Sequence, residues 1–482
     1  MSRGGDPLPH PQQPSPSSLF PLSAFSASSP PKRAANYTWK SRSRYSASTP
    51  LRLRLLLPLF ILLEIRPVKA FTSPFPRYRF HSAFSLGSAR IRLNPWSLPA
   101  STLIMNEEVE TNTKSGLPAP IKDKSVPLTD TSLKPFLEHI IAGASLSSSD
   151  VEAAFDRILA GSDPVQVGAL LAMLRQRGET PVEIAGMVRA MLKQRYPVSV
   201  TGKLLDIVGT GGDGAHTINI STAAIILAAA CGCKAAKLGN RSVSSKCGSA
   251  DVLETLGIDM ELTAEQVAEC IETTGVGFMF APVVHPTMKK VAPIRKALGV
   301  RTAFNIVGPL LNAAGAQHAV VGVFQERLLD VLAGTLGEIG TVDRALIIHG
   351  VGLDEISPLG PSTIVELKNV APAGQARVYE RTSYTFDPLT CGIPRCAIED
   401  LRGGDATENA ALLRQVLSGG PERGAKRDAV VLNAAAGLYV YGSVPSLAEG
   451  VTLAYDILAS GKALVKLDEW IACSQALKKG GG

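Results

Sequence analysis

The hydrophobic pattern of this 482-residue chain changes its period near Lys203. From about Ser132 to Tyr196, apolar side chains recur at helical spacing. Beyond Lys203, short apolar runs alternate with helical segments, a pattern typical of an α/β sheet with helices on both faces. We therefore predict a small all-helical domain over residues 130–202 and a larger α/β domain with a central, mostly parallel sheet over residues 203–477. A leader, residues 1–105, precedes both domains.

Four amphipathic helices joined by short loops are expected in the first domain. Their boundaries carry Ser, Asp or Thr cap residues, Pro at the first helical position, or a final Gly, which are common start and stop signals. One exposed apolar face of this domain would suit a contact between two copies of the chain. The expected helices are LKPFLEHIIAG, SSSDVEAAFDRILAG, DPVQVGALLAMLRQRG and TPVEIAGMVRAMLKQR.

Buried strands are expected in the second domain wherever a short apolar run is bounded by glycine or polar residues. Residues 446–474 instead show helical spacing. Residues 360–425 are rich in Gly and Pro, and only TIVEL and ARVYE resemble strands there. The expected buried strands are LLDIV, CKAAKLGN, VGFMFAPV, HAVVGVF, RALIIHG and AVVLNAA.

The leader is strongly basic, whereas the rest of the chain is not. Residues 1–100 contain fourteen Lys and Arg but only two acids, Asp6 and Glu64, so they carry a net charge of +12. The whole chain carries +7, so the remaining 382 residues sum to −5. We therefore do not expect the folded part to bind nucleic acid.

The composition of the leader, rich in Ser, Pro and Arg and poor in acids, is that of an organelle transit peptide. We expect a disordered transit peptide and a location in the plastid (chloroplast) stroma, with mitochondrial import or an artefactual extension upstream of Met105 as alternatives. The apolar run Leu51–Leu63 contains two Arg and a Pro and is shorter than the ~20 residues that span a bilayer, so no membrane role is expected. Seven cysteines with no zinc-like spacing predict reduced thiols.

The loop GTGGDG, residues 209–214, matches the pattern of dinucleotide-binding loops. Its surroundings argue against that function, because the next helix is delayed to about Ser221 and no acid lies between Asp213 and Asp251 to bind a ribose. A P-loop is excluded because no Gly-Lys-Ser/Thr closes the loop. A glycine-rich turn with no ligand is the remaining structural alternative.

The glycine loop still has the features of a phosphate site. Consecutive glycines let backbone N–H groups converge on an anion. Asn219, Ser221 and Thr222 are expected to cap the following helix, whose positive end favours negative charge. A carboxylate at Asp213 would repel phosphate unless it binds a sugar hydroxyl or organises a metal. The combination predicts a phosphorylated sugar with several anionic groups as the ligand.

Three later segments add candidate ligands. KLGNRSVSSKCGSADVLETLG gathers cations and hydroxyl groups between a strand and a helix, which suits an anion. HGVGLDEISPLG places Asp354 and Glu355 after an apolar strand, where paired carboxylates suit Mg²⁺, although a solvated acidic turn is the commoner meaning. HPTMKKVAPIRKALGVRTAFNIVGPLLN contributes His285, Arg295 and Arg301, which taken singly are ordinary surface charges.

Together these segments resemble the anthranilate phosphoribosyltransferase family in order and spacing, from about Ser132 to Leu477. The matching blocks are GTGGDGAHTINIST, KLGNRSVSSKCGSADVLETLG, PIRKALGVRTAFNIVGPLLN and DEISP. The resemblance implies a glycosyltransferase of tryptophan biosynthesis that moves a phosphoribosyl group from phosphoribosyl pyrophosphate to anthranilate. It also implies Mg²⁺ as cofactor, a helical domain followed by an α/β domain, and a homodimer formed through the helical domain.

The resemblance also implies roles for individual residues, none of them certain to be catalytic. Anthranilate would contact Gly209, Asn240 and Arg295, with His285 as a weaker candidate near its access path. Mg²⁺ would be served by Ser221, Asp354 and Glu355. Phosphoribosyl pyrophosphate would contact Gly209, Gly212, Asp213, Thr217, Asn219, Ile220, Ser221, Thr222, Lys237, Gly239, Asn240, Arg241, Ser242, Val243, Ser244, Ser245 and Ser249.

Two positions depart from the family pattern. Leu238 stands where the family usually has His, and GPLLNAAGA lacks the Asn-Pro that the family tends to have. Both departures leave the anion and metal ligands intact, so we expect changes in affinity or hinge behaviour rather than loss of chemistry. Two alternative functions remain open at this point: a pyrimidine nucleoside phosphorylase, and a non-catalytic relative that binds nucleic acid or an effector.

Overall fold

The computed structural model describes residues 130–242, 245–420 and 424–480. The predictions for the leader over residues 1–105, including Leu51–Leu63, therefore fall outside the described residues, as do the candidate ligands Val243 and Ser244.

The predicted helical domain is confirmed, with all four helices in the expected segments. Ser147 and Asp150 form a capping box at the start of α2, and Thr180 and Glu183 form another at the start of α4. Asp163 caps α3 by accepting hydrogen bonds from two backbone N–H groups. The helices are α1 (Lys134–Ile141), α2 (Ser148–Ala160), α3 (Pro164–Arg177) and α4 (Pro181–Lys193).

The central sheet has seven strands in the order β3-β2-β1-β4-β5-β6-β7. The pairings among β1 to β5 are parallel, whereas β6 pairs with β5 and β7 pairs with β6 in antiparallel fashion. The mostly parallel sheet expected from the sequence is thus confirmed. The strands are β1 (Leu205–Gly209), β2 (Ala235–Gly239), β3 (Val276–Phe280), β4 (His318–Gly322), β5 (Arg344–Gly350), β6 (Ser362–Asn369) and β7 (Tyr379–Phe386).

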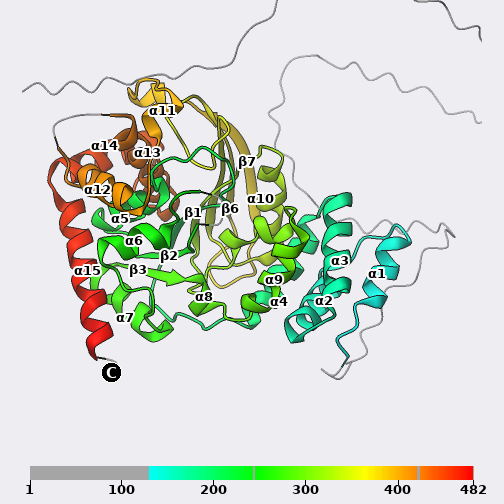
Figure 1. The fold of residues 1–482 in the computed structure, drawn as a ribbon. Coiled ribbons are helices and arrows are strands. Elements are labelled where there is room, and N and C mark those ends of the chain that lie inside the picture. Colours follow the sequence, from blue (N-terminus) through cyan, green and yellow to red (C-terminus); the bar gives the residue numbers. More distant parts are fainter. Residues whose placement is uncertain (1–129, 243–244, 421–423, 481–482) are drawn as a thin grey trace, which may run out of the picture. The chain divides into compact units, whose positions relative to one another are not determined.

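Helices cover both faces of this sheet and create two hydrophobic cores (Figure 1). Because side chains alternate along a strand, neighbouring β4 residues enter different cores: Val321 packs with the helical domain, and Val320 packs with α5 and α13. The helical domain contacts the larger domain through α9 and α10. Loops follow the carboxyl ends of β1, β2 and β5 and form this edge of the sheet.

The remaining helical elements connect the strands or follow the sheet. Among the described residues, no helix is long and apolar enough to span a membrane. They are α5 (Ile220–Ala230), α6 (Ser249–Leu256), α7 (Ala264–Thr274), α8 (Ala281–Val284), α9 (Met288–Leu298), η1 (Ala303–Asn305), η2 (Gly308–Leu310), α10 (Leu328–Ile339), η3 (Pro388–Cys391), α11 (Ile398–Leu401), α12 (Ala406–Leu417), α13 (Ala425–Tyr441), α14 (Leu447–Ala459) and α15 (Lys462–Gly480).

One predicted strand is wrong, and several others have different bounds. AVVLNAA lies inside the 17-residue helix α13, which is buried on nearly every side; periodicity alone does not separate such a helix from a buried strand. VGFMFAPV is a strand only to Phe280, after which Ala281–Val284 form α8. Within residues 360–425, TIVEL belongs to β6, and β7 begins only at Tyr379, near the end of ARVYE.

Candidate active site

Three loops meet at the carboxyl edge of the sheet, each following one parallel strand. The glycine loop follows β1, residues 240–248 follow β2, and the segment with Asp354 and Glu355 follows β5. Ligand sites in open α/β sheets are commonly built at this edge. The glycine loop takes backbone conformations that favour glycine, since φ is 67° at Gly211 and 84° at Gly212.

Asp354 lies close against the ends of β1 and β4. Its Oδ2 accepts a hydrogen bond of 2.6 Å from the backbone N–H of Gly211. A Cβ atom on Gly209 would overlap the Asp354 carboxylate, and one on Gly322 would overlap the Asp354 carbonyl group. Glycine at both strand ends is therefore required for Asp354 to reach the glycine loop.

Glu355 and Lys237 face the first turn of α5. The Ser221 backbone N–H donates to Glu355 Oε1 at 3.1 Å, and Lys237 Nζ donates to Ile207 O at 2.7 Å and to Ser221 Oγ at 3.4 Å. Lys237 is only 1% exposed. Burial lowers the pKa of Lys237, and the neighbouring carboxylates oppose that shift.

The acids at this edge repel one another. Burial raises the pKa of Asp354, and the nearby charge of Asp213 raises it further. Burial and the charge of Asp354 hold the pKa of Glu355 well above its usual range, although Lys237 pulls it down. Such a site gains stability from a bound cation.

The donor set fits a hard divalent cation that is shared with a ligand. Carboxylate and hydroxyl oxygens are the ligands that Mg²⁺ prefers, and Mg²⁺ is commonly held by one or two carboxylates plus substrate phosphates. Within the described residues, no group of three or more His, Cys, Asp or Glu side chains is arranged to hold a metal alone. Ser221, Asp354 and Glu355 are therefore compatible with Mg²⁺ that also contacts an anionic substrate.

Asp213 is partly tied to its own loop, because its Oδ1 accepts a hydrogen bond of 3.1 Å from the Ala215 backbone N–H. The Gly212 carbonyl is held from outside by Arg301, whose guanidinium donates to it at 2.7 Å and lies over the Phe324 ring at 4.6 Å. Arg301 thereby supports the loop from a segment 89 residues further along the chain.

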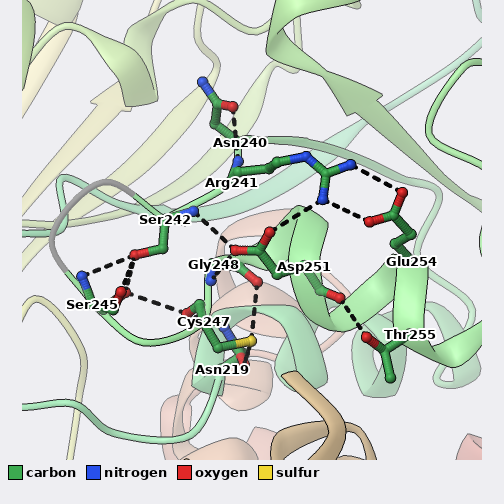
Figure 2. A network of polar contacts seen from close by, with 10 residues as sticks. All are labelled: Asn219, Asn240, Arg241, Ser242, Ser245, Cys247, Gly248, Asp251, Glu254 and Thr255. Carbon is green, nitrogen blue, oxygen red and sulfur yellow. Dashed lines mark hydrogen bonds and ion pairs between the residues drawn. The ribbon is translucent and has the colours of Figure 1, made fainter. Parts of the chain in front are cut away.

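The loop after β2 is organised by α6 (Figure 2). Asp251 Oδ2 accepts from the backbone N–H groups of Ser242 and Gly248, at 3.0 and 2.8 Å. Arg241, expected to contact phosphoribosyl pyrophosphate, directs its guanidinium instead to Glu254 and Asp251. Its role in substrate binding stays a prediction.

The other predicted residues of this loop lie at its ends or on its surface. Asn240 is exposed, and its Oδ1 accepts from the Arg241 backbone N–H at 2.7 Å. Ser242 and Ser245 bond to each other through their side chains. Ser249 accepts a hydrogen bond of 3.1 Å from Thr222, which joins the starts of α5 and α6.

Asn219 occupies the N-cap position of α5, but its side chain makes no capping hydrogen bond. Its Nδ2 donates to Cys247 O at 3.2 Å, and its Oδ1 accepts from Asn409 Nδ2 at 2.9 Å. The expectation that Asn219 caps the helix through its side chain is therefore wrong. Thr222 bonds to Ser249, and Ser221 offers its backbone N–H to Glu355.

Residues 401–403, which the sequence did not mark as part of the site, pair with the segment that follows the glycine loop. Thr217 forms a bridge with Arg402, and the Ile218 and Gly403 backbone N–H groups bond to Leu401 O and His216 O. Nothing in the pattern of residues 397–409 marks them as neighbours of a loop so distant along the chain.

Arg295 and His285, the predicted acceptor-side residues, lie at α9 and just before it. The Arg295 guanidinium lies 5.2 Å from the centre of the Phe304 ring, and no ion pair to it occurs within the described ranges. Burial lowers the pKa of Arg295 without a neighbouring acid to oppose it. His285 is buried, and its Nε2 donates to Leu311 O at 2.7 Å. Leu238 is likewise buried, in β2.

Asp206 lies beneath Lys237 at the start of β1 and is 2% exposed. Its Oδ2 accepts from Asn312 Nδ2 at 2.7 Å, whereas its Oδ1 has no hydrogen-bond partner among the residues described. Burial raises the pKa of Asp206 to about 6, although the charge of Lys237 lowers it. Neither Asp206 nor Asn312 was among the predicted site residues.

Several known proteins that resemble this chain in sequence and fold are named anthranilate phosphoribosyltransferase. Residues 134–194 match the helical bundle domain of the glycosyl transferase family, and residues 201–464 match its a/b domain. The anthranilate phosphoribosyltransferase of Chlamydia felis is 44% identical over 346 residues, which is 72% of this chain and 98% of the relative. That of Methanosarcina acetivorans is 47% identical over 340 residues, or 70% of this chain and 89% of the relative.

Solved structures agree with these relatives. The anthranilate phosphoribosyltransferase from Thermus thermophilus has a TM-score of 0.65 and 45% identity, covering 70% of this chain and 99% of its own. The Saccharomyces cerevisiae enzyme, in complex with phosphoribosyl pyrophosphate and Mg, has a TM-score of 0.65 and 27% identity, covering 72% and 99%. The same yeast enzyme has also been solved with 4-fluoroanthranilate, with a TM-score of 0.64 and 26% identity.

Replacing Asp206 by Asn is expected to change how stability depends on pH. Because the folded-state pKa of about 6 lies above the ordinary 3.8, the folded protein binds this proton more tightly, and wild-type stability falls as pH rises through that window. Asp206→Asn removes the effect, so the free energy of unfolding of the variant relative to wild type should increase by about 2 kcal/mol between pH 4 and pH 7. Urea denaturation at several pH values measures this difference, and a constant difference would contradict the assignment.

Proposed function

The chain belongs to the anthranilate phosphoribosyltransferase family, and we propose that it transfers the phosphoribosyl group of phosphoribosyl pyrophosphate to the amine of anthranilate. The products are phosphoribosylanthranilate and pyrophosphate, a step of tryptophan biosynthesis. The observation that carries this proposal is the meeting of Asp354, Glu355 and Lys237 beneath the glycine loop. Mg²⁺ is the cofactor, as in the yeast complex.

The residues at the sheet edge would stabilise the leaving pyrophosphate. The anthranilate nitrogen forms a bond to the anomeric carbon with its lone pair, the C–O bond breaks, and pyrophosphate departs with that electron pair. An arylamine is largely unprotonated at neutral pH, so no strong general base is required, and the proton is released from nitrogen after attack. Lys237 and the glycine loop N–H groups would neutralise the charge that builds on the leaving oxygens.

Ser221, Asp354 and Glu355 would hold Mg²⁺ against the pyrophosphate. When bound, the cation would add positive charge beside the leaving group. The chain's contribution is to fix the two carboxylates in place through the Gly211 and Ser221 backbone N–H groups.

Arg295 would bind the anthranilate carboxylate. Its guanidinium has no acidic partner within the described parts of the chain and rests on the Phe304 ring, so it is available for a bidentate contact. His285 is engaged with Leu311 O, which suits a role in shaping the access path rather than in touching substrate. Leu238 can pack against an aromatic ring but offers it no hydrogen bond.

A fluorescence assay of anthranilate consumption tests the activity directly. Consumption should require both phosphoribosyl pyrophosphate and Mg²⁺. Thymidine with phosphate, the substrates of a pyrimidine nucleoside phosphorylase, should give no reaction. An enzyme that cleaves thymidine and leaves anthranilate untouched would refute the proposal.

We also propose that the chain forms a homodimer through the helical domain. Val165 on α3 is 79% exposed and Ile141 on α1 is 65% exposed, and α1 and α3 pack against each other. Contiguous apolar patches on a surface are typical of an interface, and these two exposed side chains on packed helices are the candidates for one. Light scattering should give a dimer mass for wild type and for the control Val465→Glu on α15, and a monomer mass for Val165→Glu with Ile141→Glu.

The leader composition supports a further proposal, that the protein acts in the plastid stroma. Residues 1–105 fused to a fluorescent protein should direct it to chloroplasts in plant cells. Accumulation in mitochondria or in the cytosol would contradict this location.

The carboxylate pair is expected to be essential for turnover. Asp354→Asn with Glu355→Gln should lower kcat/KM for phosphoribosyl pyrophosphate by about 100-fold or more and raise the Mg²⁺ concentration needed for half-maximal rate. Asp468→Asn with Glu469→Gln is a matched control, because it neutralises adjacent exposed acids on α15. Near-normal activity of the first variant would refute the metal assignment.

Arg295→Ala should mainly affect anthranilate. Loss of a charge-assisted contact predicts an increase of about tenfold or more in KM for anthranilate, with KM for phosphoribosyl pyrophosphate little changed. Lys296→Ala on the same helix, whose side chain is exposed, serves as control. An unchanged KM for anthranilate in the Arg295 variant would exclude the proposed contact.

A further inference from the structure

The segment Leu311–Ala313, between η2 and β4, accepts hydrogen bonds from His285, predicted near the acceptor, and from residues that follow α4. Leu311 O accepts from His285 Nε2 at 2.7 Å. Ala313 O accepts from the Val198 backbone N–H at 3.2 Å and from Arg195 Nε at 3.3 Å. Residues that follow α4 or precede α9 are thus hydrogen-bonded to the two carbonyl groups that flank Asn312.

The side chain of Asn312 itself hydrogen-bonds to residues of the sheet. Its Nδ2 donates to Asp206 Oδ2 at 2.7 Å and to Ala236 O at 2.8 Å, and its Oδ1 accepts from the Ala314 backbone N–H at 3.0 Å. Both amide hydrogens and the carbonyl oxygen are therefore used.

Asp206 and Ala236 immediately precede the residues that carry the phosphoribosyl half of the site. Ile207 and Lys237 come next on β1 and β2, and they are joined by the bond from Lys237 Nζ to Ile207 O. The glycine loop begins two residues after Ile207, at Gly209. A shift of Asn312 would therefore be transmitted to the strand positions that set both Lys237 and the loop.

Packing alone does not account for a carboxylate at position 206. The side chain is buried, and Oδ1 is left without a hydrogen bond among the described residues, an arrangement that costs stability. Groups that cost stability in a folded protein are commonly retained for function.

We propose that Asp206 and Asn312 form a positioning pair that aligns the acceptor half of the site with the phosphoribosyl half. This role rests on the proposed function, since it concerns the geometry between two substrates. Neither residue touches substrate; both act through the elements they join. Alignment of two bound reactants contributes strongly to rate, and a displacement of about 1 Å can cost about 100-fold.

The pair should therefore affect kcat more than either KM. Asp206→Asn and Asn312→Ala should each lower kcat by about 10- to 100-fold and change the KM of each substrate by no more than about twofold, because each half-site keeps its own ligands. The double variant should lose little more than the worse single variant, because the residues act as a unit. Asn369→Ala is the matched control: Asn369 Oδ1 also accepts two backbone N–H bonds, but between β6 and β7.

A second readout does not require activity. In Asn312→Ala, hydrogen exchange of the segments around Val198 and Leu311–Ala316 should become faster, whereas the segment containing β1 should stay protected. Cooperative thermal unfolding of each variant confirms that it is folded.

The possible outcomes distinguish a failure of the positioning role from a failure of the proposed function. A wild-type enzyme without transferase activity would refute the proposed function, while hydrogen exchange would still test the link made by Asn312. An active wild type with unchanged kcat in Asp206→Asn and Asn312→Ala would overturn the positioning role. A rise in KM for one substrate with kcat unchanged would also overturn it, because that pattern indicates a contact confined to one half-site.

Discussion

The site depends on a steric constraint at the edge of the sheet: the strands must end without side chains where the β5 loop crosses them. Gly209 on β1 and Gly322 on β4 leave room for Asp354, and a Cβ atom on Gly350 of β5 would meet the carbonyl of Glu355. Because the strands end in this way, the two acids reach the glycine loop and the start of α5. Parallel strand order alone would bring these loops to one edge but would not let them touch.

Charge is the second determinant of the site. Lys237 is a buried cation among carboxylates from β1 and the β5 loop, and burial raises the pKa of both Asp354 and Glu355. Burying such charges is costly, and a dication with an anionic ligand would offset that cost. In the proposed mechanism, the same residues would supply both binding energy and the charges that act on the leaving group.

The sequence predicts those features whose causes are local. Caps and Pro residues mark α2 to α4, and glycines with positive φ mark the loop after β1. Features that depend on distant contacts were missed or wrong. The helix α13 is buried on nearly every side, so it has no polar stripe to reveal its period. Asn219 finds its partners in Cys247 and Asn409 instead of its own helix.

The pairing of residues 401–409 with the segment that follows the glycine loop has a consequence for how the protein matures. Asn219 and Asn409 are 190 residues apart along the chain, and His216 and Ile218, which follow the glycine loop, are hydrogen-bonded to Gly403 and Leu401. Closing so long a segment is slow compared with forming local helices. A chain made from its N-terminus onward therefore has its helical domain available long before the segment after the glycine loop can be held in place. Synthesis must pass Asn409 before this segment has its full set of contacts, so an early-terminated product would keep the four helices without a completed site.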